Sequence, residues 1–575
     1  MALQALLNLQ FLFWSGWIVS LFLSVCFVVG LILENVFRKE IFLDSSVDSK
    51  RHDLSVAPFS AYPIIISAAL ITVAFVSRYW LSGLMFGPWY FSDETLESCI
   101  NPFQLSQGEN LWGGYTNYLT YSIYLMAYRL FGFYGSGPRV ARATNIFFFA
   151  TSLVILYWAL QRALGKQVCW MVIGIMLISS PFITHSIFAT PITFSLVPVA
   201  TVLLILMRPL SQVSAGFLGP SLLAGLYLYP AAFITGVCLV FFHAIVCYRS
   251  WTGKTRSIFL VAFLFFAGLG YQMRTLLTGN PDWKQWAGGL LSFEHIAPHS
   301  MVVLKDTFWE SSSWVALNHQ APYLDTVMLG FLAVGLGSSL IFSKVQPSVL
   351  DRKWVWISLL SFLGSVVLSA LARDYPGVRR TFSSIPLLFL IAGLGLKYLW
   401  RWKGLRPLLV VTVIVCFGLV TLRSYVISQK DWPALRNWSR PPGFMHAVTE
   451  ALLQSTHSQK SVVIVAYPSE DPYHALQYRC ALSLDEKLNQ YFQKARVIPQ
   501  SELNRRHELG GEFVLFANEP FSDNRLQDIF GRPPTSSKIR RFSESPKPNE
   551  LIAIYEFTSD SASSGDTGRT RSSNY

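Results

Sequence analysis

The sequence predicts a polytopic α-helical membrane protein of about twelve spans, with interfacial helices in its first outer loop and a small C-terminal α/β domain. Of its 575 residues, 52% are apolar and only 14% are charged. Apolar runs long enough to cross a bilayer recur as far as residue 424, and ordinary polarity follows. The net charge of +13 is dispersed between these runs, so we expect membrane lipids and no nucleic acid among the partners.

The N-terminal part, residues 1–62, is predicted to be one membrane helix and a cytoplasmic linker. Residues 9–36 are apolar and no small-residue cleavage site follows, which indicates a retained helix. The linker after it is polar and basic, whereas the N-terminal tip has no Lys or Arg, so the tip is expected outside. The next span, 63–84, is interrupted only by Arg78 and leads back to the outer side.

The membrane core is predicted to occupy residues 63–424. Two long apolar runs need splitting, because 168–207 would be roughly 60 Å long as a single helix against a bilayer core of about 30 Å. Thr190-Pro191 and Tyr229-Pro230 are the expected breaks. The spans after the first two are then expected at 143–164, 168–188, 191–207, 214–229, 230–248, 257–276, 323–343, 354–372, 381–400 and 407–424.

The distribution of Lys and Arg sets the orientation of these spans. With both termini outside, Lys and Arg are about four times denser in the cytoplasmic loops than in the outer ones, as the positive-inside rule requires. The two long outer loops, 85–142 and 277–322, are where function is expected. Within the first, Asn117–Phe131 is amphipathic and rich in Tyr, which indicates a helix lying in the membrane interface.

Residues 425–558 are predicted to form a small soluble domain outside the membrane. Strands are expected at 461–467, 512–518 and 550–557, with a helix between 471 and 484. Residues 559–575 are rich in Ser, Gly, Thr and Asp and are expected to be disordered.

Asp93 and Glu94 are adjacent carboxylates placed just beyond the end of an apolar segment, at the rim of the membrane. Carboxylates at this position are costly unless they are paired, hydrated or used, so they are candidate site residues. The aromatic run Trp89–Phe91 before them suits the interfacial belt. The alternative is an ordinary polar loop after a membrane helix.

The first half of the chain resembles the GT-C superfamily of polyprenyl-phosphate-sugar-dependent glycosyltransferases, in particular its protein O-mannosyltransferase and aminoarabinose transferase branch. The resemblance lies in the order of short elements over residues 63–424. These elements are the outer Asp-Glu, Leu130-Phe131-Gly132, the run Gly137–Arg142 that opens a span, Ser180-Pro181, and the turn from Tyr375-Pro376 to Arg380.

The resemblance implies a helix bundle whose first outer loop forms interfacial helices beside a cavity. It implies transfer of a sugar from a polyprenyl-phosphate carrier to a lipid, glycan or protein acceptor at the outer face, with inversion at the anomeric carbon. Asp93 matches the family's base position, and Glu94 matches its neighbour. A base to take the acceptor proton and a cation to hold the leaving phosphate are what this chemistry needs.

The candidate cations for that phosphate are Arg373, Arg379 and Arg380, which lie at an outer span junction and can chelate two phosphate oxygens. Arg139 has a weaker claim, as does Arg142. The alternative for each is an anchor to lipid headgroups.

The sequence departs from the resemblance after Ser180-Pro181. Here His185 opens the stretch His-Ser-Ile-Phe-Ala-Thr-Pro, so a second acidic anchor known from some relatives is missing. Glu97, Glu109, Asp282 and Asp306 are the possible replacements, and His185 itself is predicted to be an interface histidine. The outer-loop histidines His295, His299 and His319 are expected to be loop residues rather than metal ligands. No cofactor is expected, and a divalent metal stays open.

Two other functions remain open. One is a transporter or lipid flippase, although the halves show no internal repeat and the spans carry almost no charge. The other is a non-catalytic assembly factor that keeps the fold. The expected location is a bacterial inner membrane, with the site and the C-terminal domain on the extracytoplasmic side.

Overall fold

The structure is a computed structural model, and the described part of the chain covers residues 62–86, 98, 101–102, 105, 118–131, 137–187, 189–278, 296–308, 326–340, 349–370, 378–412, 414–415, 461–466, 495–499, 512–517, 520–541 and 551–558. The chain divides into two compact units, Met1–Ile66 and Ser67–Tyr575. The predicted N-terminal helix, its linker, the 471–484 helix and the disordered tail lie outside the described residues, apart from Tyr62, the linker's last residue, which begins a helix.

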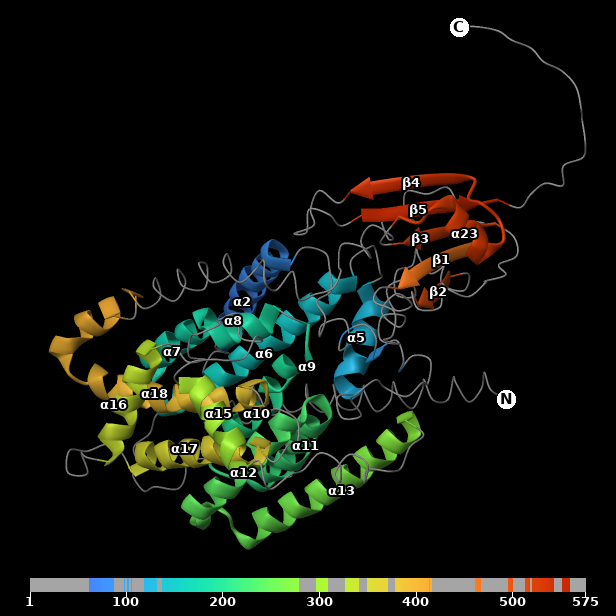
Figure 1. The fold of residues 1–575 in the computed structure, drawn as a ribbon. Coiled ribbons are helices and arrows are strands. Elements are labelled where there is room, and N and C mark those ends of the chain that lie inside the picture. Colours follow the sequence, from blue (N-terminus) through green and yellow to red (C-terminus); the bar gives the residue numbers. More distant parts are fainter. Residues whose placement is uncertain are drawn as a thin grey trace, which may run out of the picture. The chain divides into compact units, whose positions relative to one another are not determined.

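Helices dominate the described part of the chain as far as Trp400 (Figure 1). The α-helices are α2 (Tyr62–Phe86), α5 (Tyr118–Phe131), α6 (Gly137–Leu164), α7 (Lys166–Ile178), α8 (Ser180–Ile187), α9 (Pro191–Phe194), α10 (Leu196–Leu206), α11 (Gln212–Leu228), α12 (Pro230–Val246), α13 (Gly253–Thr278), α15 (Ile296–Phe308), α16 (Thr326–Leu340), α17 (Val349–Ala370) and α18 (Ile385–Trp400). Short 3-10 helices occur at η2 (Tyr248–Ser250), η3 (Val378–Ser384) and η4 (Lys403–Leu405).

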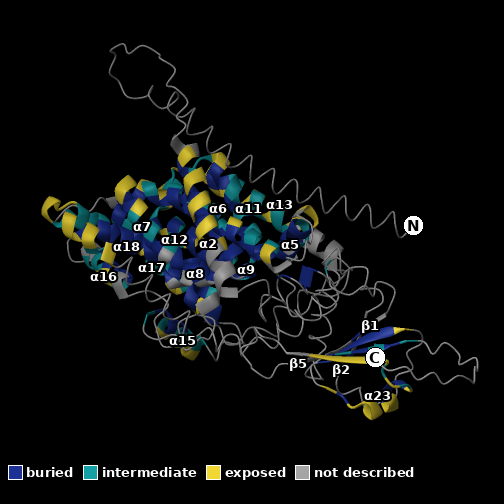
Figure 2. Ribbon diagram, turned by 90° about the horizontal axis from the view of Figure 1, so that it is seen from above, coloured by how far each residue is buried: buried dark blue, intermediate teal, exposed yellow. Residues whose placement is uncertain are grey.

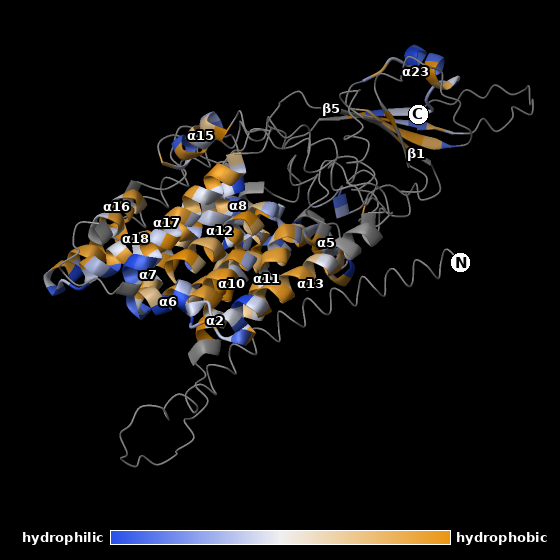
Figure 3. Ribbon diagram, turned by 90° about the horizontal axis from the view of Figure 1, so that it is seen from below, coloured by the Kyte–Doolittle hydropathy of each residue, from blue (hydrophilic) through white to orange (hydrophobic). Residues whose placement is uncertain are grey.

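Three of these helices are long and apolar enough to cross a membrane, namely Arg139–Leu164, Asp351–Ala370 and Arg380–Trp400. Apolar residues also cover most of the other helices of the bundle (Figure 3), including shorter ones such as α10, α11 and α12. Nearly every predicted span from 63–84 to 381–400 thus corresponds to one helix or to a broken pair of helices. The count of twelve spans stays a prediction.

The two predicted breaks are confirmed, and both have the same cause. Thr190 has extended backbone angles (φ −127°, ψ 154°) before Pro191, and Tyr229 is likewise extended before Pro230. A residue that precedes proline is disfavoured in the helical region, whereas proline itself suits the first turn of a helix. A third break was not predicted: Ser179, with ψ 141°, ends α7 and divides the predicted span 168–188 in two.

Most residues of α10 and α18 are buried, nine of eleven and twelve of sixteen. Figure 2 shows that exposed residues occur along the outer faces of other helices of the bundle, such as α2. α18 packs against α16 through glycines, which let two backbones approach closely. A Cβ atom added at Gly335 would lie 2.2 Å from the Ile391 carbonyl oxygen, and one added at Gly395 would lie 2.4 Å from that of Phe331. This contact therefore has no room for any side chain.

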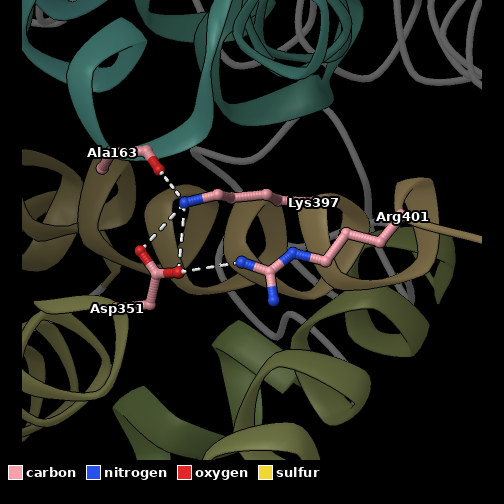
Figure 4. A network of polar contacts seen from close by, with 4 residues as sticks. All are labelled: Ala163, Asp351, Lys397 and Arg401. Atoms are coloured by element: carbon pink, nitrogen blue, oxygen red, sulfur yellow. Dashed lines mark hydrogen bonds and ion pairs between the residues drawn. The ribbon is translucent and has the colours of Figure 1, made fainter. Parts of the chain in front are cut away.

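A polar network joins α6, α17 and α18 at one end of the bundle (Figure 4). The Lys397 ammonium donates to the Ala163 carbonyl at 2.6 Å and to both carboxylate oxygens of Asp351, while Arg401 lies 3.8 Å from that carboxylate. The C-termini of α6 and α18 thus meet the N-terminus of α17, and we call this the Lys397 end. By sequence it is the predicted cytoplasmic end.

The C-terminal part contains a mixed five-stranded sheet of order β2-β1-β3-β5-β4. Its strands are β1 (Ser461–Ala466), β2 (Ala495–Pro499), β3 (Phe513–Ala517), β4 (Ser536–Arg541) and β5 (Leu551–Phe557). β1 is parallel to β2 and β3, and β5 is antiparallel to β3 and β4. The three predicted strands are confirmed as β1, β3 and β5. β2, β4 and the helix α23 (Asp523–Phe530) were not predicted.

α23 packs on one face of this sheet through a small aromatic core. Phe513 stacks on Phe557 at 4.3 Å between ring centroids, and Phe530 of α23 contacts both rings. The helix starts at Ser522, whose hydroxyl accepts from the Arg525 backbone, and ends at Gly531 in the left-handed region (φ 75°). The sheet and helix therefore form a core of their own.

Candidate functional site

The candidate site lies at the end of the bundle opposite Lys397, where η3 meets several helix starts. η3 packs against α9, α12, α15, α17 and α18. The N-termini of α9, α12 and α18 all lie here, each with a proline in its first turn: Pro191, Pro230 and Pro386. Helix N-termini carry partial positive charge and favour anions. We call this region the η3 end.

η3 is held rigidly against α12 by a hydroxyl pair. The Ser383 hydroxyl donates to the Ala231 carbonyl at 3.0 Å and lies 2.8 Å from the Thr235 hydroxyl. Since Ser383 has one hydroxyl proton, Thr235 donates to Ser383. Residues 381–384 are all buried, whereas Arg380, one residue earlier, is half-buried. We call the buried residues 381–384 the η3 platform, and Arg380 lies at its edge.

An aromatic cluster lies beneath this platform. The imidazole of His185 lies 4.5 Å from the Phe382 ring, and Phe182 contacts both Phe382 and Phe389. All four side chains are buried. His185 is thus packed within the bundle, and its assignment as an interface histidine stays a prediction.

Asn145 of α6 ties the broken segment between α8 and α9 to the bundle. Its amide nitrogen donates to the carbonyls of His185 and Ser186 at 3.0 Å and lies 3.2 Å from the Thr193 hydroxyl. The last carbonyls of a helix have no partner within it, and Asn145 supplies one here. The break at Thr190 is therefore stabilised by a polar side chain from a neighbouring helix.

α5 confirms the helix predicted over 117–131, within the predicted first outer loop. Tyr121, Tyr124 and Tyr128 are fully buried along one face. The Tyr128 hydroxyl donates to the Ser98 carbonyl at 2.6 Å, and Thr120 donates to the carbonyl of Leu228 at the C-terminus of α11. The hydroxyls of Tyr128 and Thr120 thus both donate to backbone carbonyls. In the sequence, Ser98 lies a few residues after the Asp93-Glu94 pair.

The structure corrects the prediction for the second outer loop. His299 and Asp306 lie on a helix, α15, rather than in a loop. His299 Nδ1 is 3.3 Å from the Ala370 carbonyl, while Phe308 contacts Phe362, so α15 runs antiparallel to α17. Asp306 is fully buried. The apolar pattern of 296–308 is short and contains Pro298, which explains why the sequence alone did not predict a helix.

The predicted site residues are placed only in part. Asp93, Glu94 and Arg373 lie outside the described residues, as do Glu97, Glu109, Asp282, His295 and His319. Arg379 belongs to η3 by its backbone. Arg380 is half-buried beside the platform, and Arg139 is exposed in the first turn of α6. Of the Arg139–Arg142 pair, the buried side chain is Arg142.

Arg78 was noted in the sequence only as an interruption of a span. It is buried, and its guanidinium carbon lies 5.6 Å from the centroid of the Phe149 ring. A single cation inside an apolar helix is the signal that identifies such a residue.

Among the described residues no group of three or more His, Cys, Asp or Glu side chains could hold a metal ion. The η3 end instead offers the half-buried Arg380, three helix N-termini and buried hydroxyls. This set suits an anionic ligand.

The chain was also compared with known proteins. No family model matches it, and neither does any curated protein sequence. Several solved structures are similar at low sequence identity. ArnT from Cupriavidus metallidurans, bound to undecaprenyl phosphate, has 13% identity and a TM-score of 0.49, with 86% of this chain and 98% of that chain covered.

Two further structures are similar at lower scores. The arabinofuranosyltransferase AftD from Mycobacteria has 15% identity and a TM-score of 0.40, with 86% of this chain and 40% of that chain covered. The apo oligosaccharyltransferase of Archaeoglobus fulgidus has 10% identity and a TM-score of 0.44, with 78% and 66% covered. All three matches have identities of 15% or less and TM-scores below 0.5, so no residue role is carried over from these structures to this chain.

Proposed function

We propose that this chain is an integral membrane glycosyltransferase. It moves a sugar from a polyprenyl-phosphate carrier to a lipid, glycan or protein acceptor on the extracytoplasmic side of a bacterial inner membrane, with inversion at the anomeric carbon. The order of sequence elements over 63–424 supports the superfamily. The observation that carries the chemistry is the position of Arg380 at the edge of the buried η3 platform.

The leaving group of this reaction is a lipid phosphate, which needs a positioned cation. Ser383 and Thr235 fix the backbone of η3, so the Arg380 side chain starts from a defined point. The helix N-termini of α9, α12 and α18 add positive potential at the same end. Arg379, Arg373 and Arg139 are further candidates for contacts with the carrier phosphate.

Asp93 is the proposed base. A carboxylate is already ionised at neutral pH and can accept the proton of an acceptor hydroxyl or amine held against it. The proton moves to the Asp93 carboxylate while the acceptor atom bonds to the anomeric carbon and the carrier phosphate leaves. Glu94 is proposed to bind or orient the acceptor. Ser98, which follows Glu94 by four residues in the sequence, is bound to α5 through the Tyr128 hydroxyl.

The test is transfer of radiolabelled sugar from a polyprenyl-phosphate donor by purified protein in nanodiscs. Asp93→Asn keeps the size of the side chain and removes its basic oxygen, so turnover should collapse while the protein stays folded. Glu94→Gln should mainly raise the KM for the acceptor. Arg380→Lys keeps the charge and loses the planar fork, so donor binding should weaken, and Arg380→Ala should weaken it further.

Two outcomes would contradict the proposal. Near-normal transfer by Asp93→Asn, with loss of transfer in Glu94→Gln, would reverse the two roles. Wild-type protein that neither binds nor consumes any polyprenyl-phosphate sugar would overturn the function itself.

A further inference from the structure

One narrow stripe of α2 packs against the bundle, and it includes a cation. Leu70, Ala74 and Arg78 follow one another at four-residue intervals and are all buried, whereas Val73 and Val76 between them are exposed (Figure 2). α6 lies against this stripe. Trp158 of α6 donates from its indole nitrogen to the Ser67 hydroxyl at 3.3 Å, and Phe149 lies beneath the Arg78 guanidinium.

Arg78 is 4% exposed, and its Nε and Nη2 atoms have no hydrogen-bond partner among the described residues. The face of an aromatic ring such as Phe149 attracts a desolvated cation, but less strongly than water hydrates it. Removing a guanidinium from water costs several kcal/mol unless it is paired. The ring alone therefore does not compensate for the burial, and an anion is required.

The two unpaired nitrogens are those of one edge of the guanidinium. The N–H groups of Nε and Nη2 lie parallel, and this edge binds two oxygens of one phosphate or carboxylate side by side. Both donors of a bidentate site are thus available together.

Carboxylates of the described bundle do not supply this anion. Asp351 is bound to Lys397 at the opposite end of the bundle, and Asp306 lies on α15, which packs on α17 and η3. A phosphate supplies two oxygens that suit this edge, and it is the oxyanion that the donor of the proposed reaction carries.

The position of Arg78 relates it to the η3 end. Phe149 contacts Phe182, which contacts Phe382 of η3, so one aromatic cluster separates Arg78 from the platform. Phe149 also lies one turn, about 5 to 6 Å, deeper along α6 than Asn145, which fixes the α8–α9 break.

We propose that Arg78 is the fixed cation of a lipid-phosphate site between α2 and α6, and that it binds the phosphate of the polyprenyl carrier. This inference rests on the proposed function for the identity of the lipid. Arg78 is not among the arginines that the sequence analysis proposed for binding the carrier phosphate.

The experiment uses the full chain in phosphatidylcholine nanodiscs. Wild type, Arg78→Met and Arg78→Lys are titrated with undecaprenyl phosphate, undecaprenol and phosphatidylglycerol, and binding and thermal stability are both measured. Arg256→Met is the matched control, because Arg256 is an exposed arginine of α13 at the Lys397 end. Wild type should bind undecaprenyl phosphate at least about tenfold more tightly than Arg78→Met, with Arg78→Lys between them.

Stability gives an independent readout. Without ligand, Arg78→Met should melt at a higher temperature than wild type, because an unpaired buried charge has been removed. Undecaprenyl phosphate should raise the melting temperature of wild type and of Arg256→Met, but not that of Arg78→Met. Undecaprenol, which lacks the phosphate, should raise none of them.

The contrary outcomes separate this inference from the proposed function. If wild type and Arg78→Met bind undecaprenyl phosphate equally, or if the ligand-free variant is destabilised, the Arg78 site is wrong and the proposed function survives. If phosphatidylglycerol alone binds in an Arg78-dependent manner, the phosphate site stands, and the carrier assignment and the proposed function both fail. If no lipid phosphate binds to wild type, both are overturned.

Discussion

Lys397 of α18 donates hydrogen bonds to both carboxylate oxygens of Asp351 of α17, at 2.9 and 3.1 Å. The side chains are 25% and 12% exposed, so solvent screens this pair only in part. Replacing Lys397 by Met leaves a largely buried carboxylate and should lower the stability by about 2 kcal/mol. Unfolding of the purified protein in mixed micelles with increasing SDS measures this loss.

The neighbouring Arg401 is the matched control for that pair. It is 46% exposed and lies 3.8 Å from Asp351, so Arg401→Met should cost less than about 1 kcal/mol. The double variant Lys397→Met with Asp351→Leu should recover part of the loss, because neither charge is left unpaired. Additive losses in the double variant would show that the two side chains are not coupled.

The contact between α16 and α18 should not accept a methyl group. A Cβ atom at Gly395 would lie 2.6 Å from the Gly335 backbone nitrogen as well as close to Phe331. Gly395→Ala and Gly335→Ala should each separate the two helices and lower the melting temperature. Gly337→Ala, on the same helix as Gly335 with nothing within 4 Å of its added Cβ, should leave the melting temperature equal or slightly higher.

Tyr555 of the C-terminal sheet exchanges two hydrogen bonds with one residue. Its hydroxyl accepts from the Phe521 backbone N–H at 2.6 Å and donates to the Phe521 carbonyl at 3.1 Å. Tyr555→Phe leaves both buried backbone groups unpaired and should cost about 1 to 3 kcal/mol. Faster exchange of the Phe521 amide hydrogen would report this, whereas Ile539→Val, at an exposed position of β4, should leave it unchanged.

The same hydroxyl gives the sheet a pH dependence. Burial raises the pKa of Tyr555, and the nearby Asp523 adds to this, while the hydrogen bond to Phe521 opposes it. A pKa raised on folding means that the contribution is complete below the unfolded value of about 10 and is lost as the pH rises through the folded value. As the pH rises through the folded pKa of Tyr555, exchange of the Phe521 amide hydrogen should show an added acceleration in wild type. This step should be absent in Tyr555→Phe.

The orientation of the chain is testable by cysteine labelling. The loops 85–142 and 277–322 and the C-terminal domain are expected on one side, and the linker 37–62 on the other. Single cysteines at Ser106 and Ser311 should react with an impermeant reagent added outside, and one at Ser49 should react only after permeabilisation. Equal accessibility of Ser106 and Ser49 would contradict the topology and the proposed function with it.

Helix positions followed from the sequence because apolar length and proline are local signals. Thr190 and Tyr229 end their helices for a reason visible in the next residue, Pro191 or Pro230. Ser179 gave no such signal in the next residue, because the nearest proline, Pro181, lies two residues further on, within α8. β4 was missed because it carries Lys538 and two arginines in place of an apolar alternation.

The site was harder to predict than the fold. Outer arginines are visible in a sequence, but the partners that fix them are not: Ser383 and Thr235 are 148 residues apart. The same holds for Asn145, whose amide nitrogen has three hydrogen-bond acceptors about forty or more residues away in the sequence. Burial of Arg142 rather than Arg139 depends on the face that α6 presents, and an apolar helix with polar residues at its start does not define that face.

The antiparallel contact between α15 and α17 sets an order of events during synthesis. α15 ends at Phe308, and α17, which contacts His299 and Phe308, begins only at Val349. The ribosome therefore completes α15 before α17, its packing partner, has been synthesised. The contact between the two helices forms only after α17 has been made, and a chain released before residue 370 should expose α15 to proteases.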